Sequence, residues 1–272
     1  MILFPNAKIN IGLNINEKRK DGYHNLETIF YPIGLADILE IQQSKENQSR
    51  FKNTGLQLRI SKDNNLCFKA FQLIKKHYAI PELNFHLHKI IPYGGGLGGG
   101  SSDASFTLKA LNQMFNLSIA SETLKSMAEK IGSDCPFFID NKPCLAWEKG
   151  NQTKPIDLPL KGMHLLLLIP NVQIDTKTAY QGIVPQKKEQ SLEEIVRHEP
   201  IDHWYKFITN DFEKSLYPKY PELKNIKSLL IEKGALFASL SGSGSAIYGI
   251  FDKKPQWGKE LKPYMSWSEV FH

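Results

Sequence analysis

Residues 92–105 decide the fold, and they read Pro92-Tyr93-Gly94-Gly95-Gly96-Leu97-Gly98-Gly99-Gly100-Ser101-Ser102-Asp103-Ala104-Ser105. Glycines let a backbone take positive φ and approach a ligand closely, at a cost in conformational entropy. The apolar spacing that follows predicts a helix over 104–115, with Ser102 or Asp103 as its cap. A glycine loop entering a helix N-terminus is an anion site, because free N–H groups and the helix dipole point the same way. We therefore expect this loop to bind a nucleotide phosphate.

Other glycine motifs fit this loop less well. The P-loop pattern Gly-x-x-x-x-Gly-Lys-Ser/Thr occurs nowhere in the chain. The spacing Gly94-x-Gly96-x-x-Gly99 matches the dinucleotide fingerprint, with Glu122 about twenty residues further on. A dense glycine run produces that spacing by chance, so we give the match little weight. A flexible linker is the other alternative, although linkers are not flanked by a strand pattern and a helix pattern.

The composition indicates a globular protein of one large or two modest domains. The 272 residues are 41% hydrophobic and 11% aromatic, which suffices for a sizeable core. The net charge of +6 is spread along the chain, so it suits anionic small molecules and does not demand a nucleic-acid partner.

The cysteine content and the short apolar runs favour a protein of the cytoplasm. There are 3 cysteines without a Cys-x-x-Cys pair, which argues against a disulfide scaffold or a zinc site and favours a reducing cytoplasm. The first residues lack a signal-type apolar stretch, and no apolar run has the length of a bilayer span. We expect a cytoplasmic protein with no membrane partner, acting as a monomer or weak homodimer.

Apolar periodicity predicts mixed α+β layers rather than strict βαβ alternation. The polar stretch 149–159 predicts a boundary between an N-terminal domain, 1–155, and a C-terminal domain, 156–272. Strand patterns lie at 8–14, 27–33, 37–42, 55–60, 84–88, 163–169, 235–240 and 246–251, with a strand-rich zone at 136–147. Helix patterns lie at 66–78, 104–115, 121–131, 176–182, 192–197, 203–216 and 222–233.

Polar residues near the N-terminus allow two interpretations each. Lys8 and Asn10 alternate with isoleucines, so they share one face of a strand, either solvated or contacting a reacting hydroxyl or phosphate. Tyr23 and His24 follow the turn dipeptide Asp21-Gly22. They are either part of a hairpin turn with a partly buried Tyr23, or a stacking and hydrogen-bonding pair for an aromatic ligand.

Two later segments are also ambiguous from their residues. Asp134 precedes Cys135-Pro136-Phe137-Phe138, so it should be partly buried and should have a cationic or hydroxyl neighbour. It either satisfies turn N–H groups or acts as a general base. The small residues 239–245 form either a tight hairpin or a place where a second backbone segment closes over a phosphate or substrate.

The order of these segments resembles the three motifs of the GHMP kinases, over almost the whole chain. The carriers are Pro-x-Ala-Lys-x-Asn at 5–10, the glycine loop, and the small-residue segment near the C-terminus. Asp21-Gly22-Tyr23-His24-x-Leu26-x-Thr28 and the segment 132–138 look like those of the members that phosphorylate a cytidine-diphosphate derivative of methylerythritol. The resemblance implies a two-domain α+β fold with the active site in the interdomain cleft. It also implies transfer of the ATP γ-phosphoryl group to the 2-hydroxyl of that substrate, in non-mevalonate isoprenoid precursor synthesis.

The resemblance also implies roles for individual residues. Asp134 would accept the hydroxyl proton, and Lys8 would hold Asp134 and the attacking oxygen. Mg²⁺ would accompany ATP, with Ser102 as its candidate ligand. Cytosine would lie between Tyr23 and Tyr180. The implied ATP-binding residues are Pro92, Tyr93, Gly94, Gly95, Gly96, Leu97, Gly98, Gly99, Gly100, Ser101 and Ser102, with Asn65 and Lys89 at the nucleoside end. The implied substrate-binding residues are Asn10, Tyr23, His24, Thr176 and Tyr180, of which Asn10 and Thr176 would contact the diphosphate or polyol.

Three rival functions remain open at this point. The first is another GHMP small-molecule kinase acting on homoserine, mevalonate or a sugar, for which Tyr23, His24 and Tyr180 would be dispensable. The second is a non-catalytic nucleotide-binding or RNA-binding module, in which Asp134 would be dispensable. The third is a dinucleotide-dependent oxidoreductase based on the Gly94-x-Gly96-x-x-Gly99 spacing.

Overall fold

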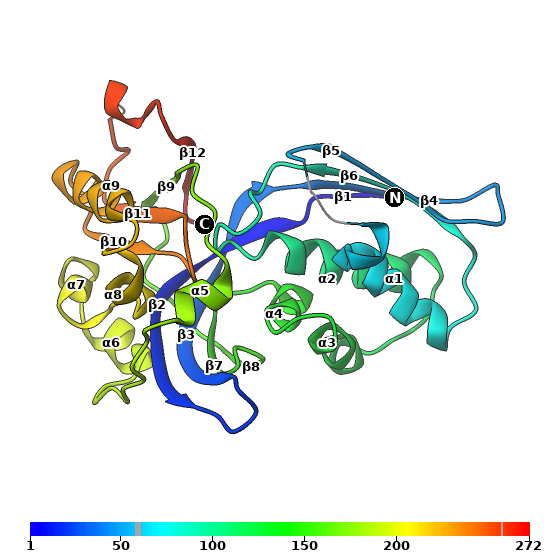
Figure 1. Cartoon of the computed structure of the whole chain (residues 1–272), viewed down its shortest axis with the longest axis horizontal. Coiled ribbons are helices and arrows are strands. Elements are labelled where there is room, and N and C mark those ends of the chain that lie inside the picture. Colours follow the sequence, from blue (N-terminus) through cyan, green and yellow to red (C-terminus); the bar gives the residue numbers. More distant parts are fainter. Residues whose placement is uncertain (58–60, 257) are drawn as a thin grey trace. The chain divides into compact units, whose positions relative to one another are not determined.

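The computed structural model describes residues 1–57, 61–256 and 258–272, which divide into two compact units (Figure 1). Unit 1 comprises residues 1–8, 32–93 and 98–142, and unit 2 comprises residues 9–31, 94–97 and 143–272. Both units are discontinuous in sequence, because strands β2 (Asn6–Lys18) and β3 (His24–Ala36) and the glycine loop each contribute residues to both. The polar stretch 149–159 contains a short strand, and the predicted domain boundary at residue 155 stays a prediction.

Unit 1 is a sheet with helices on one face. In the sheet, of order β1-β4-β6-β5, β5 and β6 run parallel and the other pairs are antiparallel. Leu83, Phe85 and Leu87 alternate along β6 with His86 and His88, so the buried leucines and phenylalanine face the helices. Figure 1 shows helices α1 and α2 beneath this sheet. The elements are β1 (Ile2–Leu3), β4 (Ile38–Gln43), β5 (Arg50–Gly55), a 3-10 turn (Lys62–Asn64), α1 (Leu66–His77), β6 (Leu83–Lys89), α2 (Gly99–Met114), α3 (Ser121–Glu129) and α4 (Cys135–Asp140).

Helix α2 begins five residues before the predicted start. Gly98 is its N-cap, in the left-handed conformation with φ of 70°, and the helix begins at Gly99. Ser102 and Asp103 are buried inside the helix, so the prediction that one of them caps it is wrong. The sequence signal was hidden because the first turn consists of glycine and serine, which carry no apolar periodicity.

Two strand predictions are corrected by the structure. The strand expected at 55–60 lies at Arg50–Gly55 instead, and residues 58–60 lie outside the described residues. The zone 136–147 begins as helix α4 with Pro136 in its first turn, and only its end is strand, β7 (Cys144–Glu148). A short continuous apolar run such as Pro136–Ile139 does not distinguish a buried strand from a buried helix.

Unit 2 contains most of the remaining elements, arranged in two sheets and several short helices. One sheet has the order β10-β11-β9-β12 and is antiparallel, with α9 packed on β10 and β11. The other has the order β2-β3-β7-β8, so the two long strands β2 and β3 are adjacent and β2 is an edge strand of this sheet. The elements are β7 and β8 (Gln152–Pro155), β9 (His164–Ile169), α5 (Thr176–Tyr180), α6 (Leu192–His198), a 3-10 turn (Ile201–His203), α7 (Trp204–Phe207), α8 (Phe212–Leu216), α9 (Pro221–Glu232), β10 (Phe237–Leu240), β11 (Ile247–Phe251), a 3-10 turn (Lys259–Leu261) and β12 (Met265–Val270).

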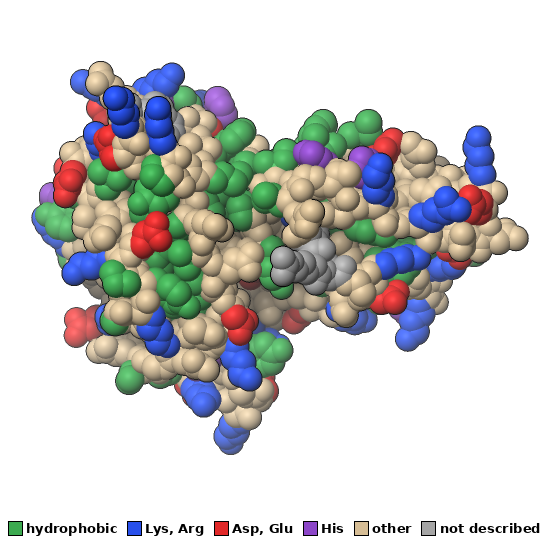
Figure 2. Space-filling view, turned by 45° about the horizontal axis from the view of Figure 1, so that its top comes forward, with side chains coloured by type: hydrophobic (Ala, Val, Ile, Leu, Met, Phe, Trp, Pro, Cys, Tyr) green, Lys and Arg blue, Asp and Glu red, His purple; other side chains and the backbone are tan. Residues whose placement is uncertain are grey.

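Surface charge and hydropathy agree with the composition. On the face drawn in Figure 2, Lys and Arg side chains are dispersed among other residues rather than gathered into one patch. Among the described residues, no helix combines the length and the apolar character needed to cross a bilayer.

Candidate active site

Lys8 and Asp134 form an ion pair in unit 1. The ammonium Nζ of Lys8 lies 3.4 Å from Oδ2 of Asp134, and the Lys8 side chain is 3% exposed while that of Asp134 is 35% exposed. Burial lowers the pKa of Lys8, and the Asp134 carboxylate opposes that shift. The solvated-face alternative for Lys8 is therefore excluded. Asp134 precedes α4 but makes no side-chain capping bond, so the geometry does not support a turn-capping role for its carboxylate.

The start of α2 lies directly beside Lys8. A Cβ added to Gly98 would come 2.9 Å from Cζ of Phe138 and 3.2 Å from Cε of Lys8, so only glycine allows this approach. The first helical N–H with a partner inside this turn is that of Ser102, which donates to the Gly98 carbonyl at 2.9 Å. The preceding amides of the turn have no intrahelical acceptor, as in any helix N-terminus. A helix N-terminus, a buried ammonium and a partly exposed carboxylate thus lie together in unit 1.

The first part of the glycine loop, Gly94–Leu97, contacts the 239–245 segment in unit 2. Ser241 Oγ donates to the Gly96 carbonyl at 2.9 Å, and the Ala246 amide donates to the Gly95 carbonyl at 3.1 Å. A Cβ on Gly96, whose φ is 72°, would lie 2.0 Å from the Ser241 carbonyl oxygen. The small residues therefore let two backbone segments touch, and the segment that closes on residues 239–245 is the glycine loop itself.

A buried hydrogen-bond network fixes Asn10 in unit 2. Asn10 Nδ2 donates to Thr28 Oγ1 at 2.9 Å, and the Asn10 amide donates to Ser241 Oγ at 3.2 Å. The Tyr248 hydroxyl donates to the Asn10 carbonyl at 2.8 Å. Sequence reasoning did not single out Tyr248, because a buried tyrosine in a strand carries no signal of its partner.

Asn210 is a second residue that sequence reasoning missed. Its Nδ2 donates to the carbonyls of Leu240 and Gly242 at 2.9 and 2.8 Å, and it is 1% exposed. It therefore holds the 239–245 segment against the turn before α8. The helix pattern predicted at 203–216 gave no signal of this residue, because only the structure divides that region into α7 and α8 around Asn210.

The aromatic residues of the predicted cytosine site lie in unit 2. The rings of His24 and Tyr180 stack with centroids 4.6 Å apart and an interplanar angle of 17°. Tyr23 is 57% exposed at the hairpin turn, and Lys149 Nζ lies 5.2 Å from its ring centroid. Burial, together with Lys18, lowers the pKa of His24. The structure thus brings His24 and Tyr180 together, while the sandwich of a base between Tyr23 and Tyr180 stays a prediction.

Thr176 is the first residue of α5 and is exposed. Its Oγ1 lies 3.4 Å from Ser243 Oγ, which places it beside the 239–245 segment in unit 2. This position suits the predicted contact with a bound substrate, and that role stays a prediction.

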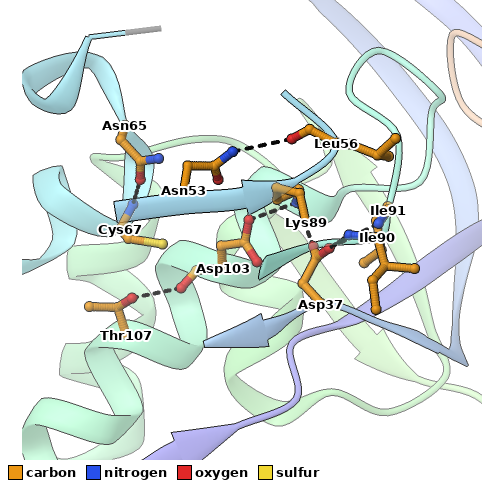
Figure 3. Close-up of polar contacts among 10 residues, drawn as sticks. All are labelled: Asp37, Asn53, Leu56, Asn65, Cys67, Lys89, Ile90, Ile91, Asp103 and Thr107. Carbon is orange, nitrogen blue, oxygen red and sulfur yellow. Dashed lines mark hydrogen bonds and ion pairs between the residues drawn. The ribbon is translucent and has the colours of Figure 1, made fainter. Parts of the chain in front are cut away.

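Asn65 and Lys89, predicted at the nucleoside end of ATP, make internal contacts in unit 1 (Figure 3). Asn65 Oδ1 accepts from the Cys67 amide at 2.9 Å and so caps α1. Lys89 is 3% exposed, and its ammonium pairs with Asp103 at 2.8 Å and with Asp37. Although burial lowers the pKa of Lys89, the two carboxylates raise it above its ordinary value. Burial raises the pKa of Asp103 to about 7, against the effect of Lys89.

The Ser102 hydroxyl is free to contact a bound ligand. Its Oγ is fully buried and has no hydrogen-bond partner among the described residues. Within the same part of the chain, no group of three or more His, Cys, Asp and Glu side chains could hold a metal ion. A metal ion here would therefore need oxygen atoms other than a carboxylate cluster, such as those of a nucleotide phosphate.

The other predicted loop residues show mixed exposure. Leu97 is 1% exposed and Tyr93 is 69% exposed, whereas Pro92 is half-buried. The Ser101 carbonyl accepts from Ser105 Oγ at 2.9 Å, and the same hydroxyl lies 2.7 Å from the Cys135 carbonyl. Ser105 thereby joins α2 to the residue that follows Asp134.

Two family models and several curated proteins match this chain. The model of the GHMP kinases N terminal domain matches residues 65–142, and that of the GHMP kinases C terminal domain matches residues 189–256. A 4-diphosphocytidyl-2-C-methyl-D-erythritol kinase of Azobacteroides pseudotrichonymphae is 50% identical over 256 residues, 94% of each chain. The chain belongs to the 4-diphosphocytidyl-2-C-methyl-D-erythritol kinase family.

Solved structures agree with this family. The crystal structure of a 4-(cytidine 5'-diphospho)-2C-methyl-D-erythritol kinase matches with a TM-score of 0.77 at 27% identity, covering 98% of both chains. The Methanococcus jannaschii mevalonate kinase matches with a TM-score of 0.75 at 16% identity, covering 100% of this chain and 98% of that one. The second likeness concerns the fold alone. The α+β GHMP kinase fold and the kinase family, both expected from the motifs, are confirmed.

Proposed function

We propose that this chain transfers the γ-phosphoryl group of ATP to the 2-hydroxyl of 4-diphosphocytidyl-2-C-methyl-D-erythritol, in non-mevalonate isoprenoid precursor synthesis. Family membership supports the kinase and its substrate. The observation that carries the chemistry is the Lys8–Asp134 pair beside Gly98 at the start of α2.

Asp134 and Lys8 have complementary roles in this proposal. Asp134 keeps an exposed part of its carboxylate, so it can accept the proton of the attacking hydroxyl. The buried Lys8 ammonium orients that carboxylate and stabilises the negative charge that develops on the attacking oxygen. Phosphoryl transfer depends mainly on positioning and charge stabilisation, so a fixed ion pair next to a phosphate site is an effective arrangement.

The glycine loop and α2 hold the ATP phosphates in this proposal. The amides at the start of α2 and the positive end of its dipole face the anion, and the ATP site comprises Pro92–Ser102 with Asn65 and Lys89. When bound, Mg²⁺ neutralises phosphate charge. The unpartnered Ser102 hydroxyl fits a role as its protein ligand, with phosphate and water oxygens completing the shell.

The acceptor site that we propose uses residues of unit 2. Tyr23, His24 and Tyr180 bind the cytosine, and Asn10 and Thr176 contact the diphosphate or polyol. The stacked His24 and Tyr180 rings form a flat aromatic surface that supports this assignment.

The remaining proposals concern organisation and compartment. We propose an ATP-binding domain over 1–155 and a second domain over 156–272. The free, buried thiols of Cys67, Cys135 and Cys144 support a reducing cytoplasm. Sedimentation of the purified chain tests the expectation of a monomer or weak homodimer.

The test is ³¹P NMR of the purified chain with Mg-ATP and the cytidine substrate, with homoserine, mevalonate and galactose as parallel acceptors. A new phosphomonoester signal with the cytidine substrate alone is expected. A signal with another acceptor instead would contradict the proposed substrate, and no signal with any acceptor would contradict the kinase activity. Asp134→Asn should slow the growth of the signal roughly 10²-fold or more. Asp140→Asn removes the same charge from the other end of α4 and should leave the growth of the signal unchanged.

A further inference from the structure

A buried cluster of charged side chains joins three elements of unit 1. Asp37 lies between β3 and β4, Lys89 ends β6, and Asp103 lies near the start of α2. Lys89 Nζ is 2.8 Å from Asp103 Oδ2 and is also paired with Asp37 Oδ2. All three side chains are at most 4% exposed. Figure 3 shows Lys89 with Asp37 and Asp103 beside it. Nothing in the proposed chemistry uses either carboxylate.

Asp37 fixes the residues that lead into the glycine loop. Its Oδ1 accepts from the amides of Ile90 and Ile91, at 2.5 and 2.9 Å. Its own amide donates to the Pro5 carbonyl at 2.9 Å, which ties it to the segment before β2. The chain is therefore held at two successive amides immediately before Pro92.

Asp103 fixes the residues that leave the loop. It belongs to the first turns of α2, so its bond to Lys89 ties this part of the helix to the end of β6. The approach requires a bare Cα at Gly99, because a Cβ there would lie 2.8 Å from Cγ2 of Ile91 and 3.2 Å from Lys89 Nζ. One glycine of the loop is thus explained by the close approach of Ile91 and of the Lys89 ammonium rather than by a phosphate.

The charges of the cluster are unequal, since two carboxylates share one ammonium. Asp103 Oδ1 is buried and has no hydrogen-bond partner among the described residues. A buried carboxylate that is not fully paired lowers the free energy of unfolding, so a contribution to stability does not explain its presence. Retaining it is explained if the cluster fixes a geometry that matters elsewhere.

We propose that Asp37, Lys89 and Asp103 form a buried clamp that holds both ends of the glycine loop in the conformation that binds ATP. Asp37 and Asp103 are positioning residues, because they act through Lys89 and the loop backbone. The inference rests on the proposed function and adds to it two residues that determine nucleotide affinity rather than the transfer step.

Asp103→Asn tests the clamp, because it keeps the side-chain shape and, at a pH above the raised Asp103 pKa of about 7, removes the charge. Losing a charge-assisted hydrogen bond should raise the KM for ATP and the Kd for the analogue AMPPNP about tenfold. We expect kcat and the KM for the cytidine acceptor to stay within about twofold, since Lys8 and Asp134 are untouched. Hydrogen exchange should accelerate at the amides of residues 98–102. Ala110→Gly is the matched control, because it weakens the same helix through lower propensity and the loss of one buried methyl group, without touching the clamp.

Each outcome decides the proposal. An ATP KM and an AMPPNP Kd unchanged in Asp103→Asn, with a fall in unfolding midpoint like that of Ala110→Gly, would overturn it in favour of a purely structural role. If Asp103→Asn does not fold, Asp37→Asn replaces it, because the amide oxygen still accepts from Ile90 and Ile91, and the same split is expected. If the wild type transfers no phosphoryl group, the proposed function is wrong, and AMPPNP binding with amide exchange still decides the clamp. A wild type that binds no AMPPNP overturns both.

Discussion

Replacing Gly96 by alanine tests the contact between the glycine loop and the 239–245 segment. The added Cβ would lie 2.0 Å from the Ser241 carbonyl oxygen and 3.0 Å from the Gly244 amide nitrogen. Real Cβ contacts stay beyond 3.0 Å, so the two backbones must separate by at least about 1 Å. Because the obstacle is backbone on both sides, no side-chain rotation relieves it.

The expected effect has two parts of different origin. Gly96 has φ of 72°, and an alanine in that region costs about 1–2 kcal/mol wherever it lies. Gly234→Ala measures this part alone, because its φ is 91° and a Cβ there meets nothing within 4 Å. The additional displacement concerns the loop that we propose to hold the ATP phosphates. A misplacement of about 1 Å lowers the rate by about 10²-fold.

Steady-state kinetics and urea unfolding measure the two parts. We expect kcat/KM for ATP to fall about 10²-fold in Gly96→Ala and to change less than about threefold in Gly234→Ala. Both variants should lose unfolding free energy, with the larger loss in Gly96→Ala. If Gly96→Ala keeps an activity like that of Gly234→Ala, the close approach has no part in catalysis and our reasoning about the loop is refuted.

Three further predictions concern the charged residues. Asp134→Asn should lower kcat by roughly 10²-fold or more while AMPPNP affinity stays within about twofold. A turnover assay measures the first and calorimetry the second, and a weakened AMPPNP affinity with an unchanged kcat would contradict the prediction. Burial lowers the pKa of Lys8, so the ammonium is lost, and kcat falls, as pH rises through a value below the ordinary lysine pKa of about 10.4. A pH profile with no decline below that value would contradict this role for Lys8. Lys89→Met should cost about 3–5 kcal/mol of unfolding free energy, because it leaves two buried carboxylates unpaired, and a urea midpoint near that of the wild type would disprove the ion cluster.

The sequence was most informative where a local pattern dictates a local structure. Helix α1 and strands β4, β6 and β9 lie within two residues of the expected positions, because periodic burial is encoded in short windows. A cationic or hydroxyl neighbour was expected for Asp134, since a partly buried acid needs a partner, and in the structure that partner is the cation Lys8.

The remaining features depend on which distant residues meet. Asp37 and Lys89 lie 52 residues apart, and nothing local in either segment indicates that they pair. Asp103 stands where a helix cap is expected, so its character as a buried ion-pair partner was concealed. The boundary of α2 was likewise invisible, because glycine and serine in a first turn give no periodic signal.

The glycines of residues 94–100 do not share one need for backbone flexibility. They differ in the neighbouring atoms that a side chain would meet at each position. A Cβ added at Gly96 would lie 2.0 Å from the Ser241 carbonyl oxygen. A Cβ added at Gly98 would lie 2.9 Å from the Phe138 ring, and one added at Gly99 would lie 2.8 Å from the Ile91 side chain. Each position therefore excludes a side chain for a different reason. Gly100 has an ordinary helical φ and only a 3.5 Å contact to Leu66, which leaves room for alanine. A library randomised over this loop should therefore return substitutions at Gly100 and none at Gly96, Gly98 and Gly99.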